Sequence, residues 1–250
     1  MNKFALIGND ISHSLSPALF EAAGGCSDGS TYGLIEAPNL AKAMETFDAE
    51  GYKGANITTP FKEEILSYCT HFDTAVQSTG AANLIVKTEL GIKAFNTDCY
   101  GVAGPLEHRG IQPCNVLVAG AGGAAKAAIY ILKKKGFPIT IANRNQSKGR
   151  ELSKKTGTDF IEEDKLRKAF HRFGLLVYTI PLLSPAFSGI PLDNIIILEA
   201  NYKKPVLNSK ISKEYISGFE WLVHQAIPGF RIFTNREPDV EAMFGLAHNS

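Results

Sequence analysis

Short apolar runs alternate with segments of helical periodicity along most of the 250-residue chain. The apolar runs, rich in β-branched residues, predict strands at 4–7, 31–35, 54–57, 82–86, 116–119, 139–142, 175–179 and 195–198. Between them, the spacing of apolar and polar positions predicts helices at 38–50, 124–135, 146–155 and 164–170. This alternation indicates an α/β fold, with a parallel, doubly wound sheet covered by helices on both faces.

The pattern changes character near residues 98–115. Before this point lies an α/β segment with polar loops, and after it comes a compact strand, glycine-rich turn, helix and strand. Residues 98–110 predict a helix that connects two lobes, and the helical pattern of residues 218–250 predicts a return to the first lobe. We therefore expect one domain of residues 1–98 plus 218–250 and a second domain of residues 99–217.

Charge and cysteine content exclude several classes of protein. The chain has 26 Lys and Arg against 25 Asp and Glu, a formal charge of +1, so we expect no nucleic acid and no membrane as partner. The longest apolar run is far shorter than the roughly 18 residues of a membrane span, and we expect no signal peptide. Four cysteines and six histidines show no metal-ligand spacing. We expect a cytoplasmic enzyme with reduced thiols and no metal.

The strongest motif is a glycine-rich turn between a predicted strand and a predicted helix. Residues 116–125 read as an apolar strand, a GxGxxA turn and the start of a helix. Small residues there allow a tight turn, close approach of a pyrophosphate and close packing of helix on strand, while the helix N-terminus offers N–H groups to the phosphates. The pattern predicts a dinucleotide site at Gly120, Ala121, Gly122, Gly123 and Ala124.

The end of the next strand indicates which dinucleotide binds. NAD-binding proteins usually place Asp or Glu there for the ribose hydroxyl, and this chain has Asn143 and Arg144 instead. A guanidinium binds a 2′-phosphate well, and Lys148 is a further candidate contact. We therefore expect NADP as the cofactor.

Uncharged polar residues gather at several predicted loop–helix junctions of the first lobe. Ser16 before Pro17 has the pattern of a helix N-cap, and capping explains each such residue taken alone. Taken together, with one lysine and one aspartate among them, they are typical of a site for a small polyhydroxylated substrate. They lie in 14–17, 56–62, 80–83 and 96–98.

On these motifs the chain resembles the shikimate dehydrogenases over essentially its whole length. The matching segments are Ser14-Leu15-Ser16-Pro17, Asn56-Ile57-Thr58-Thr59-Pro60-Phe61-Lys62, Gly80-Ala81-Ala82-Asn83, Asn96-Thr97-Asp98, Gly120-Ala121-Gly122-Gly123-Ala124, Asn143-Arg144 and Gln225-Ala226. The resemblance implies a two-lobed enzyme, with an N-terminal α/β substrate-binding domain and a Rossmann-type NADP-binding domain. It implies reversible reduction of 3-dehydroshikimate to shikimate with NADPH, in aromatic amino-acid biosynthesis.

The resemblance also implies roles for individual residues. Ser14, Ser16 and Tyr202 would bind the substrate carboxylate. Thr58, Asn83, Asp98 and Gln225 would bond its hydroxyls, and Thr179 and Gly218 would join the cofactor contacts. Lys62 and Asp98 would form the catalytic pair. Independently of the family, hydride reduction of a ketone builds negative charge on oxygen, which a lysine ammonium can stabilise and then protonate.

Three positions depart from the family pattern. Tyr178 replaces an asparagine after a strand, Trp221 replaces a methionine that would touch the nicotinamide, and residues 199–202 lack the usual aspartate. Trp221 could stack on the cofactor or only pack.

Two other functions stay open. One is a quinate/shikimate dehydrogenase that uses NAD or NADP, against which Ser14, Ser16 and Arg144 count. The other is a non-catalytic NADP-sensing protein, which would have no need for both Lys62 and Asp98. The sequence is compatible with a monomer or a homodimer.

Overall fold

The chain folds into two compact units. A computed structural model describes residues 1–208 and 212–248. The first unit contains Met1–Thr97 and the segment from Gln225 onward, and the second contains Asp98–His224. The second boundary, between His224 and Gln225, lies inside helix α8 (Gly218–Thr234).

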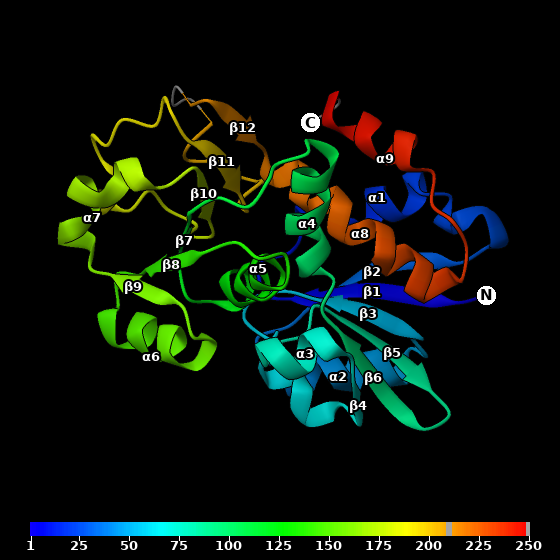
Figure 1. Cartoon of the computed structure of the whole chain (residues 1–250). Coiled ribbons are helices and arrows are strands. Elements are labelled where there is room, and N and C mark those ends of the chain that lie inside the picture. The colour runs from blue at the N-terminus through cyan, green and yellow to red at the C-terminus, as the bar shows by residue number, and fades with distance from the viewer. Residues whose placement is uncertain (209–211, 249–250) are drawn as a thin grey trace. The chain divides into compact units, whose positions relative to one another are not determined.

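The first unit is built on a six-stranded mixed sheet in the order β2-β1-β3-β5-β6-β4 (Figure 1). Its strands are β1 (Lys3–Gly8), β2 (Thr31–Glu36), β3 (Gly54–Ile57), β4 (His71–Phe72), β5 (Leu84–Thr88) and β6 (Gly91–Phe95). Strand β1 pairs in parallel with β2 and β3, whereas β5 is antiparallel to both β3 and β6. The expectation of parallel strands is confirmed for β1, β2 and β3 and is wrong for β5 and β6, because only two residues join these two strands and such a short connection makes a hairpin.

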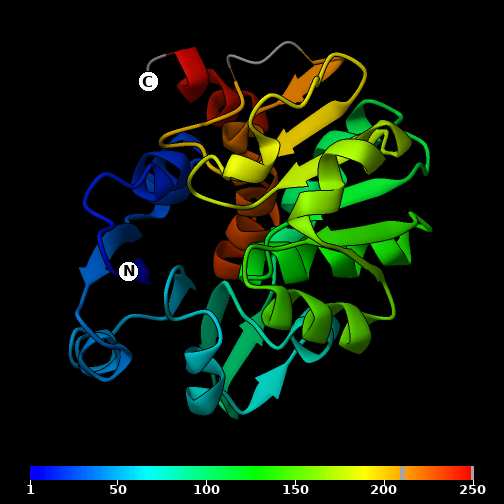
Figure 2. The ribbon, with the colours of Figure 1, turned by 90° about the vertical axis from the view of Figure 1, so that its left-hand side faces the viewer.

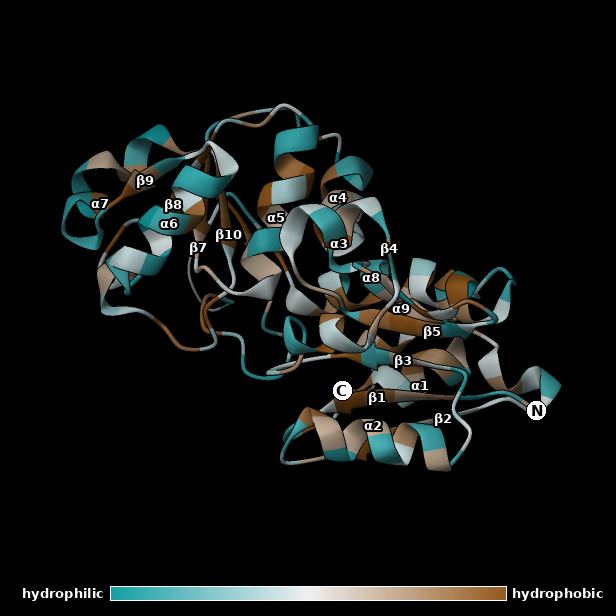
Figure 3. Cartoon of the chain, turned by 90° about the horizontal axis from the view of Figure 1, so that it is seen from below, coloured by the Kyte–Doolittle hydropathy of each residue, from teal (hydrophilic) through white to brown (hydrophobic). Residues whose placement is uncertain are grey.

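Helices bury apolar faces against this sheet. They are α1 (Ser16–Ala22), α2 (Leu40–Ala49), α3 (Thr74–Thr79) and the later part of α8, while α9 (Val240–Gly245) packs on α1. In α2 the buried residues Leu40, Ala43, Met44 and Phe47 follow helical spacing, so one side of the helix is apolar and the other polar (Figure 3). The side chain of Asn39 caps this helix by accepting the Lys42 N–H at 3.0 Å.

The second unit contains a parallel sheet in the order β12-β11-β10-β7-β8-β9, whose strands run side by side in Figure 2. The strands are β7 (Val116–Ala119), β8 (Ile139–Ala142), β9 (Asp159–Ile161), β10 (Leu175–Tyr178), β11 (Ile196–Glu199) and β12 (Glu214–Ile216). The helices are α4 (Asp98–His108), α5 (Gly123–Lys134), α6 (Gln146–Thr156), α7 (Glu163–Ala169) and the start of α8. Alternate residues of β7 enter two separate cores, so both faces of the sheet are covered, as predicted.

Helices α4 and α8 approach closely at two glycines of α4. A Cβ atom on Gly101 would lie 2.3 Å from Cδ1 of Trp221, and one on Gly104 would lie 2.2 Å from Nδ1 of His224. Burial lowers the pKa of His224, which favours the neutral ring in this contact. Trp221 is only 4% exposed and belongs to the core of the second unit. The indole therefore packs, which decides between the two alternatives left by the sequence.

We expect Gly101→Ala to lower the free energy of unfolding by about 1–3 kcal/mol, because the added methyl group overpacks the contact with Trp221. Urea unfolding measures the change. Gly245→Ala is the matched control, since nothing lies within 4 Å of its Cβ position and its unfolding energy should not fall. Equal stability of the two variants would contradict close packing at Gly101.

Candidate active site

A loop of residues 9–15, the serine loop, follows β1 and leads into α1. The Ser14 hydroxyl donates to Oγ of Ser16 at 3.1 Å and accepts the Ser16 N–H at 3.2 Å. Helix α1 begins at Ser16 itself, so the prediction of Ser16 as N-cap is wrong: its hydroxyl pairs with Ser14 instead of capping the helix. The two half-buried hydroxyls thus lie side by side.

Lys62 is anchored through its backbone and its neighbour. Phe61 is 2% exposed in the core of the first unit, and its N–H bonds the carbonyl of Thr58 at 3.0 Å. The Lys62 carbonyl accepts the Ala82 N–H at 2.8 Å, next to Asn83. The lysine side chain is half-buried.

A buried amide network joins three predicted site segments of the first unit. Nδ2 of Asn83 donates to Oγ1 of Thr97 and to Oε1 of Gln225, both at 2.9 Å. Oδ1 of Asn83 accepts the Thr97 N–H at 2.6 Å. Asn83 and Gln225 are 142 residues apart in the chain, and the fold brings them into direct contact. Asp98 follows Thr97, is 6% exposed, and is the first residue of α4 in the second unit.

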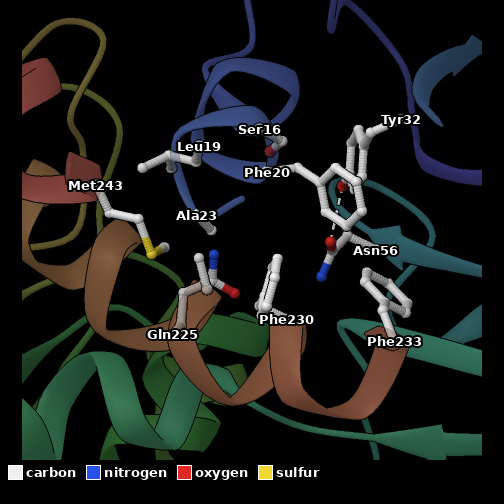
Figure 4. A pocket seen from close by; sticks show the side chains of 11 residues that line it. Ser16, Leu19, Phe20, Ala23, Tyr32, Asn56, Gln225, Phe230, Phe233 and Met243 are labelled. Carbon is white, nitrogen blue, oxygen red and sulfur yellow. Dashed lines mark hydrogen bonds between the residues drawn. The ribbon is translucent and has the colours of Figure 1, made fainter. Parts of the chain in front are cut away.

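A pocket of the first unit opens beside this network (Figure 4). Its polar lining includes Ser16, Asn56 and Gln225, and Phe20, Phe230 and Met243 lie on its apolar side. The Tyr32 hydroxyl donates to Oδ1 of Asn56 at 2.7 Å, and the Asn56 amide donates to the Asn83 carbonyl at 3.2 Å. Tyr32 carries no signal in the sequence, because a tyrosine in a strand is expected to be a core residue.

The glycine turn in the second unit has the geometry of an anion site. Gly120 adopts φ +117°, which only glycine tolerates easily, and a Cβ there would lie 2.3 Å from Oγ1 of Thr179. Gly122 occupies the N-cap position of α5, so no side chain caps the first N–H groups, and nothing lies within 4 Å of its Cβ position. Uncapped N–H groups with open space before them fit the phosphates of a dinucleotide.

The sheet order places this turn where such ligands bind. Strands β7 and β10 are neighbours at the point where the strand order reverses, and Ala119 pairs with Tyr178 across them. Gly120 and Thr179 therefore leave the sheet together at its carboxyl edge, where Thr179 donates to the Ala119 carbonyl at 2.8 Å. In open α/β sheets this reversal point forms the ligand crevice.

The residues after β8 lie at the same edge, because Ala142 pairs with Ala119. Asn143 is half-buried and donates to the Asn145 carbonyl at 2.8 Å, while Asn145 caps α6 through the Lys148 N–H. Arg144 and Lys148 are exposed, and the Arg144 guanidinium makes no ion pair to any residue in the described ranges. This donor set fits a 2′-phosphate better than a ribose hydroxyl.

Two positions that depart from the family pattern are structural in this fold. The Tyr178 hydroxyl is buried, accepts the Ser184 N–H and donates to the Leu182 carbonyl, and its burial raises its pKa. Glu199, at the carboxyl end of β11, is 0% exposed. Glu199 was not among the residues predicted from the sequence.

The predicted residues divide between the two units. The first unit contains Ser14, Ser16, Thr58, Lys62, Asn83 and Gln225. The second contains Asp98, Tyr202, Gly218 and the residues of the glycine turn and the β8 edge.

No helix in residues 1–208 and 212–248 is long and apolar enough to cross a membrane. In residues 1–208 and 212–248, no group of three or more His, Cys, Asp or Glu residues could hold a metal ion.

Comparison with known proteins gives a consistent result. Residues 6–85 match the family model of the shikimate dehydrogenase substrate binding domain, and residues 106–181 match that of shikimate / quinate 5-dehydrogenase. The shikimate dehydrogenase (NADP(+)) of Syntrophobacter fumaroxidans is 31% identical over 98% of this chain and 93% of its own length. That of Staphylococcus epidermidis is 30% identical over 96% and 95%.

Solved structures agree with the sequence relatives. Shikimate dehydrogenase from Mycobacterium tuberculosis aligns over the full length of both chains with a TM-score of 0.87 and 31% identity. The Thermus thermophilus enzyme, in complex with NADP(H) and shikimate, gives a TM-score of 0.87 and 26% identity, covering 100% of this chain and 99% of that one. The two-unit α/β fold, the family models and these relatives agree that the chain belongs to the shikimate dehydrogenase family.

Proposed function

We propose that the protein is an NADP-dependent shikimate dehydrogenase that reversibly reduces 3-dehydroshikimate to shikimate in aromatic amino-acid biosynthesis. The observation that carries this proposal is the buried network of Asn83, Thr97 and Gln225, which presents uncharged hydrogen-bonding groups beside Lys62 and immediately before Asp98. Family membership and the relatives named shikimate dehydrogenase (NADP(+)) support it.

Substrate recognition in this proposal uses short, mostly uncharged side chains. Ser14 and Ser16, with their paired hydroxyls, bind the carboxylate together with Tyr202. Thr58, Asn83, Asp98 and Gln225 bind the ring hydroxyls. The side chains of Asn83 and Gln225 are hydrogen-bonded to each other, so their amide groups are oriented before substrate binds.

Lys62 supplies the proton and Asp98 is its partner in the proposed chemistry. Bound NADPH supplies the hydride. The Lys62 ammonium donates a hydrogen bond to the carbonyl oxygen, stabilises the charge that develops there and then transfers a proton to it. In the opposite direction Lys62 takes the hydroxyl proton and passes it to solvent, so oxidation releases one proton.

In this proposal the second unit binds NADP through residues of several short loop segments. The turn residues Gly120, Ala121, Gly122, Gly123 and Ala124 receive the pyrophosphate at the N-terminus of α5, which is left uncapped. Asn143, Arg144 and Lys148 receive the 2′-phosphate. Thr179 and Gly218 line the remaining part of the site. The open space at Gly122 and the unpaired guanidinium of Arg144 in the described residues support this assignment.

We expect Arg144→Leu to raise the Kd for NADP about 10- to 100-fold and to change the Kd for NAD by less than about twofold, because only NADP carries the 2′-phosphate. Isothermal titration with both cofactors measures this. Arg172→Leu, at another exposed arginine of the same unit, is the control. An equal loss of affinity for both cofactors would remove Arg144 from 2′-phosphate recognition.

The assay that tests the function crosses two substrates with two cofactors. We expect shikimate with NADP to give the fastest formation of reduced nicotinamide, and quinate or NAD to give slower rates. The description of one matching family model includes quinate, which keeps a quinate/shikimate dehydrogenase as the second candidate. A protein that binds NADP but oxidises neither substrate with either cofactor would be a sensor and not a dehydrogenase.

The setting of the enzyme is part of the same proposal. We expect a cytoplasmic protein, a monomer or homodimer, with residues 1–98 plus 218–250 as the substrate domain and residues 99–217 as the NADP domain. All four cysteines are free thiols, which fits a reducing compartment.

A further inference from the structure

Two buried polar side chains lie at the carboxyl ends of β10 and β11, and the proposed chemistry uses neither. Tyr178 and Glu199 are partners in the register of these two parallel strands, and both side chains are 0% exposed. A buried carboxylate is costly unless hydrogen bonds satisfy its oxygens. The partners of Glu199 therefore indicate its role.

Glu199 closes the loop that carries Tyr202. One carboxylate oxygen accepts the Val206 N–H at 2.7 Å, and the other accepts the Leu207 N–H at 3.1 Å and the Tyr215 hydroxyl at 2.7 Å. Burial and the Glu199 charge raise the pKa of Tyr215, so its hydroxyl remains a donor. Because Glu199 immediately precedes residues 200–205 and Val206 immediately follows them, this one carboxylate ties the two ends of the loop together.

Backbone contacts fix the same loop from its other sides. A Cβ on Gly218 would lie 2.6 Å from the Tyr202 nitrogen and 2.5 Å from the Asn201 carbonyl carbon, so the start of α8 packs directly on this backbone. The Asn201 side chain accepts the Lys204 N–H at 3.2 Å and donates to the Pro181 carbonyl at 3.3 Å. The loop is thus held by its main chain and by Asn201.

The hydroxyl of Tyr202 takes part in none of the contacts that fix this loop. Its side chain is half-buried, and its hydroxyl makes no hydrogen bond to the residues that the structure describes. A loop whose backbone is fixed while one hydroxyl stays available is arranged to present that hydroxyl to a ligand.

We propose that Glu199 is a positioning residue for substrate binding: by closing the 200–205 loop, it fixes Tyr202 where the phenol meets the substrate carboxylate. This inference rests on the proposed function, in which Tyr202 binds that carboxylate. Glu199 itself touches no substrate and acts through Tyr202.

The first test is Glu199→Gln, which keeps the shape of the side chain but turns an N–H group toward donors that need an acceptor. We expect the KM for shikimate to rise about tenfold, with kcat within about threefold and the Kd for NADP unchanged. Glu107→Gln makes the same chemical change at an exposed ion pair with Lys135 in the same unit and should change none of these values. An unchanged KM in folded Glu199→Gln would overturn the proposal.

A double-mutant cycle separates positioning from a merely structural role. If Glu199 acts through Tyr202, the KM of Glu199→Gln/Tyr202→Phe equals that of Tyr202→Phe alone. The proposal would be overturned if the effects of the two changes on KM multiply, or if Tyr202→Phe leaves KM unchanged. Shikimate turnover by the wild-type protein would in that case still support the proposed function. Failure of the wild-type protein to turn over shikimate would refute both.

If Glu199→Gln does not fold, Tyr215→Phe is the milder variant, because it removes one of three donors to the carboxylate. We expect its KM for shikimate to rise about threefold, with the same lack of additivity toward Tyr202→Phe. An unchanged KM in folded Tyr215→Phe would then count against Glu199 as a positioning residue.

Discussion

Lys62→Ala is expected to lower kcat by about 10²- to 10⁴-fold and to leave the Kd for NADP unchanged, because it removes the proton donor to the developing alkoxide. Lys62 lies in the first unit, whereas all the proposed cofactor contacts lie in the second. Steady-state kinetics with shikimate and fluorescence titration with NADPH measure the two effects separately.

The matched control for this change is Lys42→Ala, at an exposed lysine of α2 in the same unit, which should keep wild-type kcat. A small amine added to Lys62→Ala should restore part of the rate, since it can occupy the space of the deleted ammonium. Near-wild-type turnover by Lys62→Ala would remove this residue from the proposed chemistry.

Gly122→Asp is expected to act in opposite directions on folding and on cofactor binding. Aspartate at the N-cap would accept N–H bonds at the start of α5 and raise the free energy of unfolding by a few tenths of a kcal/mol, up to about 1 kcal/mol. The same carboxylate would stand where the pyrophosphate binds, and repulsion between like charges costs several kcal/mol. The Kd for NADP should rise about 100-fold or more.

Thermal unfolding and isothermal titration measure the two effects of Gly122→Asp. Gly122→Asn caps the helix without the charge, so it should give a similar stability and a much smaller loss of NADP affinity. Unchanged NADP binding by a folded Gly122→Asp protein would place the phosphates away from the N-terminus of α5.

The glycine turn could be predicted because its signal is local. Strand β7, Gly120 and α5 follow one another in about twenty residues, and each carries its own pattern of apolar or small residues. Local patterns also misled: Ser16 reads as an N-cap, yet the nearby hydroxyl of Ser14 provides a better partner. The antiparallel β5–β6 pair was missed because β6 was not recognised as a strand.

The contact between Asn83 and Gln225 could not be derived from periodicity. The two amides are 142 residues apart, and only the return of α8 to the first unit brings them together. The resemblance to a family gave both residues a common role, and the structure shows the direct hydrogen bond. Glu199 stayed hidden for a different reason: its function depends on donors from Leu207 and Tyr215, which no local pattern links to it.

The most direct test of the proposed function is the consumption of NADPH by the purified protein with 3-dehydroshikimate, followed by the absorbance of reduced nicotinamide. We predict consumption that requires both the protein and 3-dehydroshikimate, forms shikimate in equal amount, and is faster with NADPH than with NADH. Folded protein that binds NADPH but consumes none in the presence of 3-dehydroshikimate would contradict the account.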